Sequence, residues 1–176
     1  MTPFEFVVRR LRWLARIPLA PQIFDSLLLA WTALRHPNRL RAMEAVEAAA
    51  IGIPAVSLTV HRLGGLGFAF GGRELGHLHG NGLLDLFTGR KLARDLVAAG
   101  RADTHHFFGE SAWVSYWVRS AADVIQAVAL LQCVFGRRQR EPANPAQAGG
   151  RVNPSEPAKS MTKIVMIRRL TRMALS

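Results

Sequence analysis

Residues 71–85 read GGRELGHLHGNGLLD, and they hold the strongest structural signal in this chain. Asn81 and Gly82 stand between two apolar runs, a pattern typical of a two-residue β-hairpin turn. His77 and His79 precede the turn at spacing i, i+2, so on a strand both imidazoles lie on one face. The sequence therefore predicts a hairpin that presents two histidines together.

The register of this hairpin decides what surrounds the histidines. A two-residue loop places His79 opposite Leu84 and His77 opposite Leu86, so the imidazoles share a face with leucines. In that register Asp85 falls on the other face of the sheet. Polar rings on an apolar face must be hydrogen-bonded, bind a ligand or line a cavity.

Further strands and helices follow from the periodicity on either side. Alternating residues between glycine-rich turns predict strands at 56–60, 66–70, 74–79 and 83–87, and short turns make these neighbours antiparallel. A fifth strand is predicted at 113–118, and helices at 3–16, 22–34, 37–50, 90–99 and 121–135. The predicted fold class is α+β: an antiparallel meander sheet of about five strands with helices packed on one face, preceded by N-terminal helices.

Composition divides the chain into three regions. Residues 1–50 form an N-terminal helical region, and in its second helix Ile23, Leu27, Trp31 and Leu34 are expected to face inward. Residues 51–136 form the α+β domain. Residues 137–176 are rich in Pro, Gly and Arg, which predicts a disordered basic tail with a short amphipathic helix at 161–174.

The charge balance limits the partners. Lys and Arg number 23 against 12 Asp and Glu, a formal net charge of +11 that favours an anionic membrane surface. No nucleic-acid module is recognisable, so we expect no specific nucleic-acid partner. Residues 17–34 are too interrupted for a confident membrane span, which leaves a helix packed on the domain or peripheral membrane contact. Cys133 is the single cysteine, which favours a reducing, cytoplasmic compartment, with or without membrane association.

His105 and His106 provide a further candidate for chemistry. Adjacent residues on an extended segment point in opposite directions, so at most one of them is expected to join the first pair. Three imidazoles can hold zinc, iron or copper. The predicted register, however, leaves the carboxylates of Glu74 and Asp85 on the other face, where they cannot support such ligands. The residues therefore favour no metal, with a metal-dependent hydrolase as a weaker alternative.

The aromatic strand at 113–118 offers a surface for a planar molecule. Trp113, Ser115 and Trp117 alternate along it, and one face of the strand is expected to stack on a small aromatic ligand. Together with Arg73 in the preceding hairpin, these three are the predicted substrate-binding residues.

Several blocks of this sequence resemble the luciferase-like domain family, which takes its name from the fungal luciferases and includes many bacterial proteins of unknown role. The blocks are residues 72–79 (GRELGHLH), 82–85 (GLLD), 96–102 (LVAAGRA), His105-His106, 113–115 (WVS), and Asp123 with Ala127 and Leu130-Leu131. The ordered succession is more specific than any single block, and the resemblance covers roughly residues 50–135.

The resemblance implies oxygenase chemistry. Fungal luciferases oxidise a hydroxylated pyrone with dioxygen, need no recognised organic cofactor or metal, and associate with membranes. Carried onto this chain, the family's histidine blocks match His77, His79 and His105, the predicted catalytic residues. A histidine base would deprotonate a small planar enolic substrate, giving a carbanion-like species that reacts with oxygen. The alternative is a non-catalytic small-molecule-binding or membrane-peripheral module.

Overall fold

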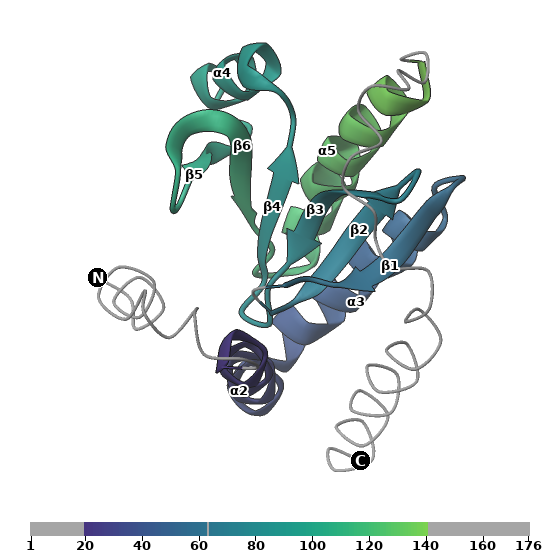
Figure 1. The fold of residues 1–176 in the computed structure, drawn as a ribbon. Helices are drawn as coiled ribbons and strands as arrows, with labels where there is room; N and C mark the ends of the chain where they lie inside the picture. Colours follow the sequence, from purple (N-terminus) through teal and green to yellow (C-terminus); the bar gives the residue numbers. More distant parts are fainter. Residues whose placement is uncertain (1–19, 63, 141–176) are drawn as a thin grey trace.

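The computed structural model describes residues 20–62 and 64–140 as helices, strands and short connections (Figure 1). In chain order these are α2 (Ala20–Arg35), α3 (Pro37–Ile51), β1 (Val56–Val60), β2 (Leu66–Phe70), β3 (Arg73–Leu78), β4 (Leu83–Phe87), α4 (Arg90–Ala98), β5 (Asp103–His105), β6 (Gly109–Trp117) and α5 (Ala121–Arg140). The predicted helices at 3–16 and 161–174, and the predicted disordered tail beyond residue 140, lie outside the described residues.

The strands form one antiparallel sheet in the order β1-β2-β3-β4-β6-β5. The first four make the predicted meander, because glycine-rich turns join each strand to the next. β6 then pairs with β4. β5, where the sequence predicted no strand, adds an edge strand of three residues, too short for an alternating pattern to reveal it. The predicted α+β class is confirmed, with six strands instead of about five.

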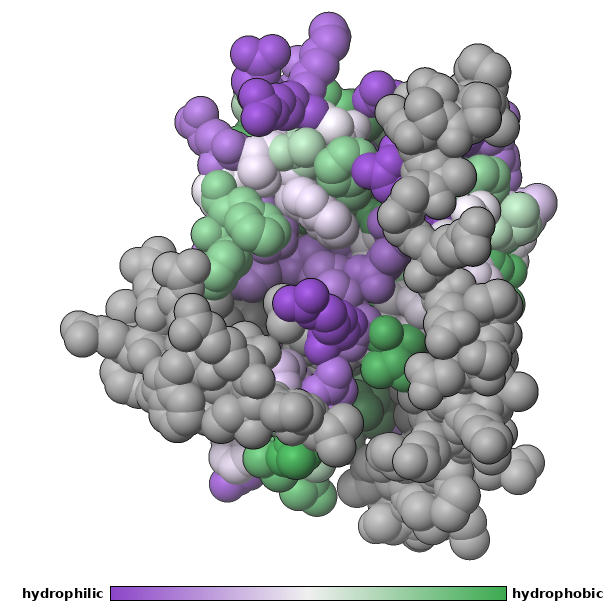
Figure 2. All heavy atoms as spheres, in the orientation of Figure 1, coloured by the Kyte–Doolittle hydropathy of each residue, from purple (hydrophilic) through white to green (hydrophobic). Residues whose placement is uncertain are grey.

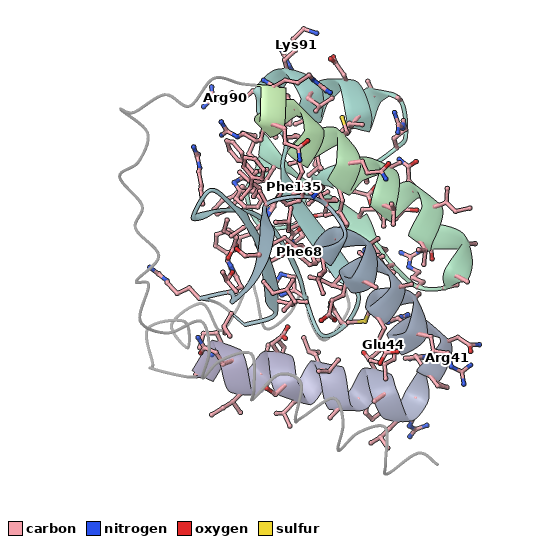
Figure 3. All side chains as sticks on the ribbon, turned by 90° about the vertical axis from the view of Figure 1, so that its right-hand side faces the viewer. Arg41, Glu44, Phe68, Arg90, Lys91 and Phe135 are labelled. Atoms are coloured by element: carbon pink, nitrogen blue, oxygen red, sulfur yellow. The ribbon has the colours of Figure 1, made fainter. Side chains whose placement is uncertain are left out.

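One face of the sheet is apolar and is covered by α3 and α5 (Figures 1 and 3). Figure 3 shows Phe68 of β2 and Phe135 of α5 between the sheet and these two helices, and both are fully buried. Met43 and Val46 of α3 join the same core. The division expected between residues 50 and 51 stays a prediction, and α3, which precedes it, contributes to the core of the sheet.

α2 lies across the end of the sheet near the turn between β3 and β4 (Figures 1 and 3). Its predicted inward face is wrong, since four large apolar side chains are 56–70% exposed: Ile23, Leu27, Trp31 and Leu34. The helix turns Asp25 inward instead, and the Asp25 carboxylate accepts a hydrogen bond of 2.9 Å from the backbone N–H of Gly80. A buried polar contact, which apolar periodicity does not reveal, therefore orients this helix.

The hairpin between β3 and β4 turns through three residues, 80–82, rather than the predicted two. The backbone N–H of His79 donates to the carbonyl of Leu83 over 2.9 Å, which closes the loop. Gly82 ends it with φ at 89°, a left-handed conformation that favours glycine. A glycine in this position is typical of three-residue hairpins.

This extra loop residue exchanges the two faces of β4. His77 lies opposite Asp85, so the predicted pairing of His77 with Leu86 is wrong by one residue. Leu84 and Leu86 point into the core and are fully buried there. Because side chains alternate between faces, a shift of one residue brings Asp85 to the histidine side of the sheet.

Candidate functional site

Five of the six histidines in the chain gather on the sheet face opposite α3 and α5. They are His61 after β1, His77 on β3, His79 just after β3, His105 at the end of β5, and His106. With Asp85 we call them the histidine cluster. Figure 2 looks onto this face and shows hydrophilic side chains gathered in a hollow over the middle strands. The sixth histidine, His36, lies between α2 and α3.

Asp85 is the centre of the histidine cluster and is fully buried. One of its carboxylate oxygens, Oδ2, lies 3.2 Å from Nε2 of His79 and 3.3 Å from Nε2 of His77. Nδ1 of His106 and Nε2 of His105 lie 3.4 and 3.8 Å from the same oxygen. The other oxygen, Oδ1, accepts a hydrogen bond of 2.5 Å from the hydroxyl of Ser115. Four imidazoles therefore face one oxygen atom.

Two further carboxylates contact the outer nitrogens of this group. Oε1 of Glu74 lies 3.1 Å from Nδ1 of His77 and 2.5 Å from Nδ1 of His61. On the other side, Oδ1 of Asp25 lies 3.5 Å from Nδ1 of His79. His77 and His79 thus each have a carboxylate beside both ring nitrogens.

A glycine on β2 makes room for part of this arrangement. A Cβ at Gly67 would lie 2.7 Å from Oε2 of Glu74 and would also collide with the hydroxyl of Thr59. With no side chain there, Glu74 reaches across the strand to His61. The ring of His61 then stacks on His77 at a centroid distance of 3.7 Å.

The carboxylates and the burial set the charges of the histidine cluster. Burial opposes a charge on His79, but hydrogen bonds to Asp25 and Asp85 raise its pKa to about 9. Burial likewise opposes ionisation of Glu74, yet hydrogen bonds from His61 and His77 lower its pKa to about 2. At neutral pH His79 is therefore protonated and Glu74 is ionised.

Asp85 itself is held in its charged form. Burial alone would raise the pKa of Asp85, but hydrogen bonds from the surrounding imidazoles, that of His106 first, hold it well below its usual range. The buried carboxylate is therefore negative at neutral pH, and the imidazoles are the groups that compensate its charge.

His105 differs from the other imidazoles because backbone groups fix its tautomer. Its Nδ1 accepts hydrogen bonds from the backbone N–H groups of Phe107 and Phe108 at 3.1 and 3.2 Å. Burial lowers its pKa to about 4, so the ring is neutral at pH 7 and its proton sits on Nε2. His105 therefore turns an N–H group, and not a lone pair, toward Asp85.

The prediction that at most one of His105 and His106 reaches the first pair is wrong. The pairing of β5 with β6 is irregular between Thr104 and His105, so the two rings do not alternate as on a regular strand. They stack on each other at 4.5 Å, and both face Asp85.

Residues 72–133 match the family model described as the Luciferase domain. This part of the chain is similar to the luciferase-like domain family. The matched stretch contains Asp85 and all the histidines of the cluster except His61, while Asp25 and His61 precede it. No curated protein and no solved structure matches the chain.

Two of the four predicted substrate-binding residues of the luciferase-like domain lie at the histidine cluster. Trp113 contacts the rings of His77 and His105 at centroid distances of 5.7 and 6.0 Å. Ser115 is buried and holds the Asp85 carboxylate. The other two contact residues outside the histidine cluster.

Arg73 and Trp117 are these other two predicted substrate-binding residues. Arg73 is exposed, with its guanidinium 5.2 Å from the ring of Phe87. The ring of Trp117 lies 5.4 Å from the guanidinium of Arg119. Binding of substrate by either residue stays a prediction.

The luciferase-like domain also has a cleft of about 650 Å³. It lies between α4 and the β5–β6 hairpin, and its lining includes Arg90, Arg94, Thr104 and Trp113. Because Trp113 also contacts the rings of His77 and His105, this tryptophan is shared by the cleft and the cluster.

Proposed function

We propose that the luciferase-like domain is an oxygenase that acts on a small planar enolic substrate at the histidine cluster. The observation that carries this proposal is Asp85, a buried carboxylate that faces four imidazoles. The ring of Trp113 lies beside two of these imidazoles. Imidazoles oriented by a carboxylate are well suited to proton transfer near neutral pH. The family match supports the same reaction class.

The proposed reaction begins when an imidazole takes the enol proton, which leaves an enolate with carbanion character. The enolate carbon then forms a bond to dioxygen, and two electrons pass from the enolate to the oxygen molecule. The proton returns from the imidazolium to the terminal oxygen, giving a hydroperoxide. Dioxygen is the only oxidant that this balance requires.

His106 is the best candidate for the base. Nδ1 of His105 is engaged by two backbone N–H groups, so His105 does not fit the base role that the sequence suggested. His79 is protonated at neutral pH and suits the stabilisation of a negative enolate or peroxide. His106 is half-buried and directs Nδ1 at Asp85, as in imidazoles that transfer protons through Nε2 while a carboxylate orients the ring.

The cleft beside Trp113 supports binding of a flat ring. Its volume of about 650 Å³ lies within the range of about 300–1,000 Å³ for small-molecule sites. A ring stacked on Trp113 would lie next to the imidazoles that Trp113 already contacts. Arg90 and Arg94 add positive charge to the lining, which suits an anionic or enolate oxygen.

Oxygen uptake by the purified full-length chain tests the proposal, with a hydroxylated 2-pyrone as the probe. We expect uptake, and we expect His106→Gln to lower its rate about 10²- to 10⁴-fold. His36→Gln is the matched control, because His36 is the one histidine outside the histidine cluster, and its rate should equal that of the wild type. Wild-type rates in H106Q would exclude His106 as the base.

Two further variants test the whole histidine cluster. We expect His77→Gln and His79→Gln to lower the rate of oxygen uptake as well, because both rings contact Asp85. Unchanged turnover in both variants, with circular dichroism showing an intact fold, would contradict catalysis by this cluster.

The exposed apolar stripe of α2 favours a second candidate function, peripheral attachment to an anionic membrane. The guanidinium of Arg35 lies 4.9 Å from the ring of Trp31, so a basic group borders the stripe. No helix in the described part of the chain combines the length and the apolar character that crossing a bilayer requires. We therefore propose contact with the surface of anionic lipid.

Flotation with phosphatidylserine vesicles tests this attachment. The variant Leu27→Glu/Trp31→Glu should lose binding, and high salt should weaken binding by the wild type. Ile125→Glu on α5 is the control, since Ile125 is exposed but lies on another helix. Equal flotation of all three proteins would contradict the proposal.

A further inference from the structure

Asp85 faces more imidazoles than one oxygen atom can accept hydrogen bonds from. A carboxylate oxygen offers two lone pairs, whereas four ring nitrogens lie within 3.8 Å of Oδ2. A cation held between His77, His79 and Asp85 would leave two imidazoles, those of His105 and His106, to donate to this oxygen. We propose that His77, His79 and Asp85 bind one divalent transition-metal ion.

The distances fit ligands that share an ion. Two atoms about 2.1 Å from a metal lie about 3.0 Å apart at a right angle and about 3.4 Å apart in a tetrahedron. The separations from Oδ2 of Asp85 to Nε2 of His77 and His79 are 3.3 and 3.2 Å. All three donor atoms lie within 4.8 Å of one another. The two rings are nearly perpendicular, at 89°, so they approach from different directions.

Each of these three side chains also has a polar partner at its other nitrogen or oxygen atom. Histidine ligands of metals usually donate their second N–H to a carboxylate or a carbonyl, which directs the remaining lone pair at the ion. Glu74 lies beside Nδ1 of His77, and Asp25 lies beside Nδ1 of His79. The hydroxyl of Ser115 holds the other oxygen of Asp85. Each proposed ligand therefore has its own supporting contact.

Two neighbouring groups of residues fit an ion less well. The set of Asp85, His105 and His106 fails at His105, whose Nδ1 accepts two backbone N–H groups, so its proton occupies the inward nitrogen. The set of His61, Glu74 and His77 is less buried, because the side chains of His61 and Glu74 are 16% and 24% exposed. The set centred on Asp85 is buried at all three positions.

The ligand set indicates which ion fits. Two histidines and one carboxylate are the ligands of iron(II) in many oxygen-using enzymes, where the remaining positions accept substrate or dioxygen. This inference departs from the metal-free expectation that the family resemblance implied. The objection to a metal came from the two-residue turn, and in the observed register Asp85 lies on the same face as the histidines. The inference goes beyond the proposed function and stands without it. The bound ion would take the place of the proton on Nε2 of His79, so metal binding would release that proton.

Cobalt(II) is a suitable probe, because it enters iron and zinc sites and gives visible absorption bands. We expect the metal-free full-length chain to bind one equivalent. His79→Gln should weaken binding about 100-fold or more, and Glu74→Gln, which removes a supporting contact, about 10- to 100-fold. His36→Gln is the matched control, because His36 lies outside the histidine cluster, and this variant should keep the wild-type affinity.

Several outcomes would overturn the inference. These are no cobalt binding by the wild type, equal weakening in H79Q and H36Q, or loss in E74Q with H79Q unaffected. If H79Q does not fold, X-ray absorption of the cobalt-loaded wild type decides, with two imidazoles and one carboxylate expected and no imidazole contradicting the site. Cobalt binding without oxygen uptake would contradict the proposed function alone, and oxygen uptake without cobalt binding would contradict the metal site alone.

Discussion

Replacing Gly80 with alanine tests how α2 is attached to the histidine cluster. A Cβ at this position would lie 2.5 Å from the carbonyl oxygen of Asp25 and 2.7 Å from the backbone nitrogen of Leu29. Both are backbone atoms of α2, so no side-chain rotation relieves the clash, and the helix must move away from the hairpin. That movement breaks the buried hydrogen bond from the N–H of Gly80 to the Asp25 carboxylate.

The expected cost of this substitution has two parts. A hydrogen bond to a charged acceptor contributes about 1.5–3 kcal/mol, and overpacking costs about 1–3 kcal/mol. Because movement of the helix relieves part of the overpacking, we expect G80A to lower the free energy of unfolding by about 3–5 kcal/mol. The pKa of His79 should also fall from its value of about 9, because Asp25 is one of the two carboxylates that raise it.

Urea unfolding followed by circular dichroism measures the first effect, and proton NMR of the histidine rings measures the second. Gly52→Ala is the matched control. Gly52 has φ at −68°, and a Cβ there would make ordinary contact at 3.4 Å. The free energy of unfolding of G52A should therefore differ from that of the wild type by less than about 0.5 kcal/mol. If G80A were as stable as G52A and left the pKa of His79 unchanged, the attachment of α2 through this contact would be wrong.

Three further substitutions probe other parts of the structure. Ser115→Ala removes the hydrogen bond to Asp85 and should cost about 1–3 kcal/mol in urea unfolding, and no loss would mean that the bond is dispensable. Leu86→Ala leaves a cavity in the core and should cost about 2–5 kcal/mol, which a normal unfolding midpoint would contradict. Asp123→Ala removes a carboxylate that accepts backbone N–H bonds before α5 and should cost about 1 kcal/mol at pH 7. Burial opposes ionisation of Asp123, but these bonds lower its pKa. The contribution of the Asp123 carboxylate to the free energy of unfolding is therefore present above its usual pKa of 3.8, and it is lost as the pH falls below that value. The difference in melting temperature between wild type and D123A should therefore shrink below about pH 3.8, and a constant difference would contradict this cause.

The sequence predicted the elements that have a clear period or a glycine-rich turn. Alternation alone predicts strands β1 to β4, and it predicts that His77 and His79 lie on one face of the sheet. Both are observed. The length of the hairpin loop did not follow, because Asn-Gly suits a two-residue turn while Gly80 allows a third residue. That single residue decided the position of Asp85 and with it the centre of the histidine cluster.

The remaining contributors to the histidine cluster come from places where local patterns carry no information. Asp25 lies on a helix 55 residues before Gly80 in the chain, and only the packing of α2 brings the two together. His106 joins because of an irregular strand pairing. His61 was visible as a polar residue in an alternating strand, and its stacking on His77 depended on the register of three strands.

The shared oxygen of Asp85 has a consequence for any measurement of protonation in this protein. When several ionisable groups interact strongly with one partner, gain of a proton by one makes gain by the next harder, and the observed midpoints belong to the group as a whole. The titration curve recorded for His79 should therefore be broadened. Substitution of a neighbouring ring that faces the same oxygen should displace this curve, so the acidity of His79 can be understood only as a property of the set.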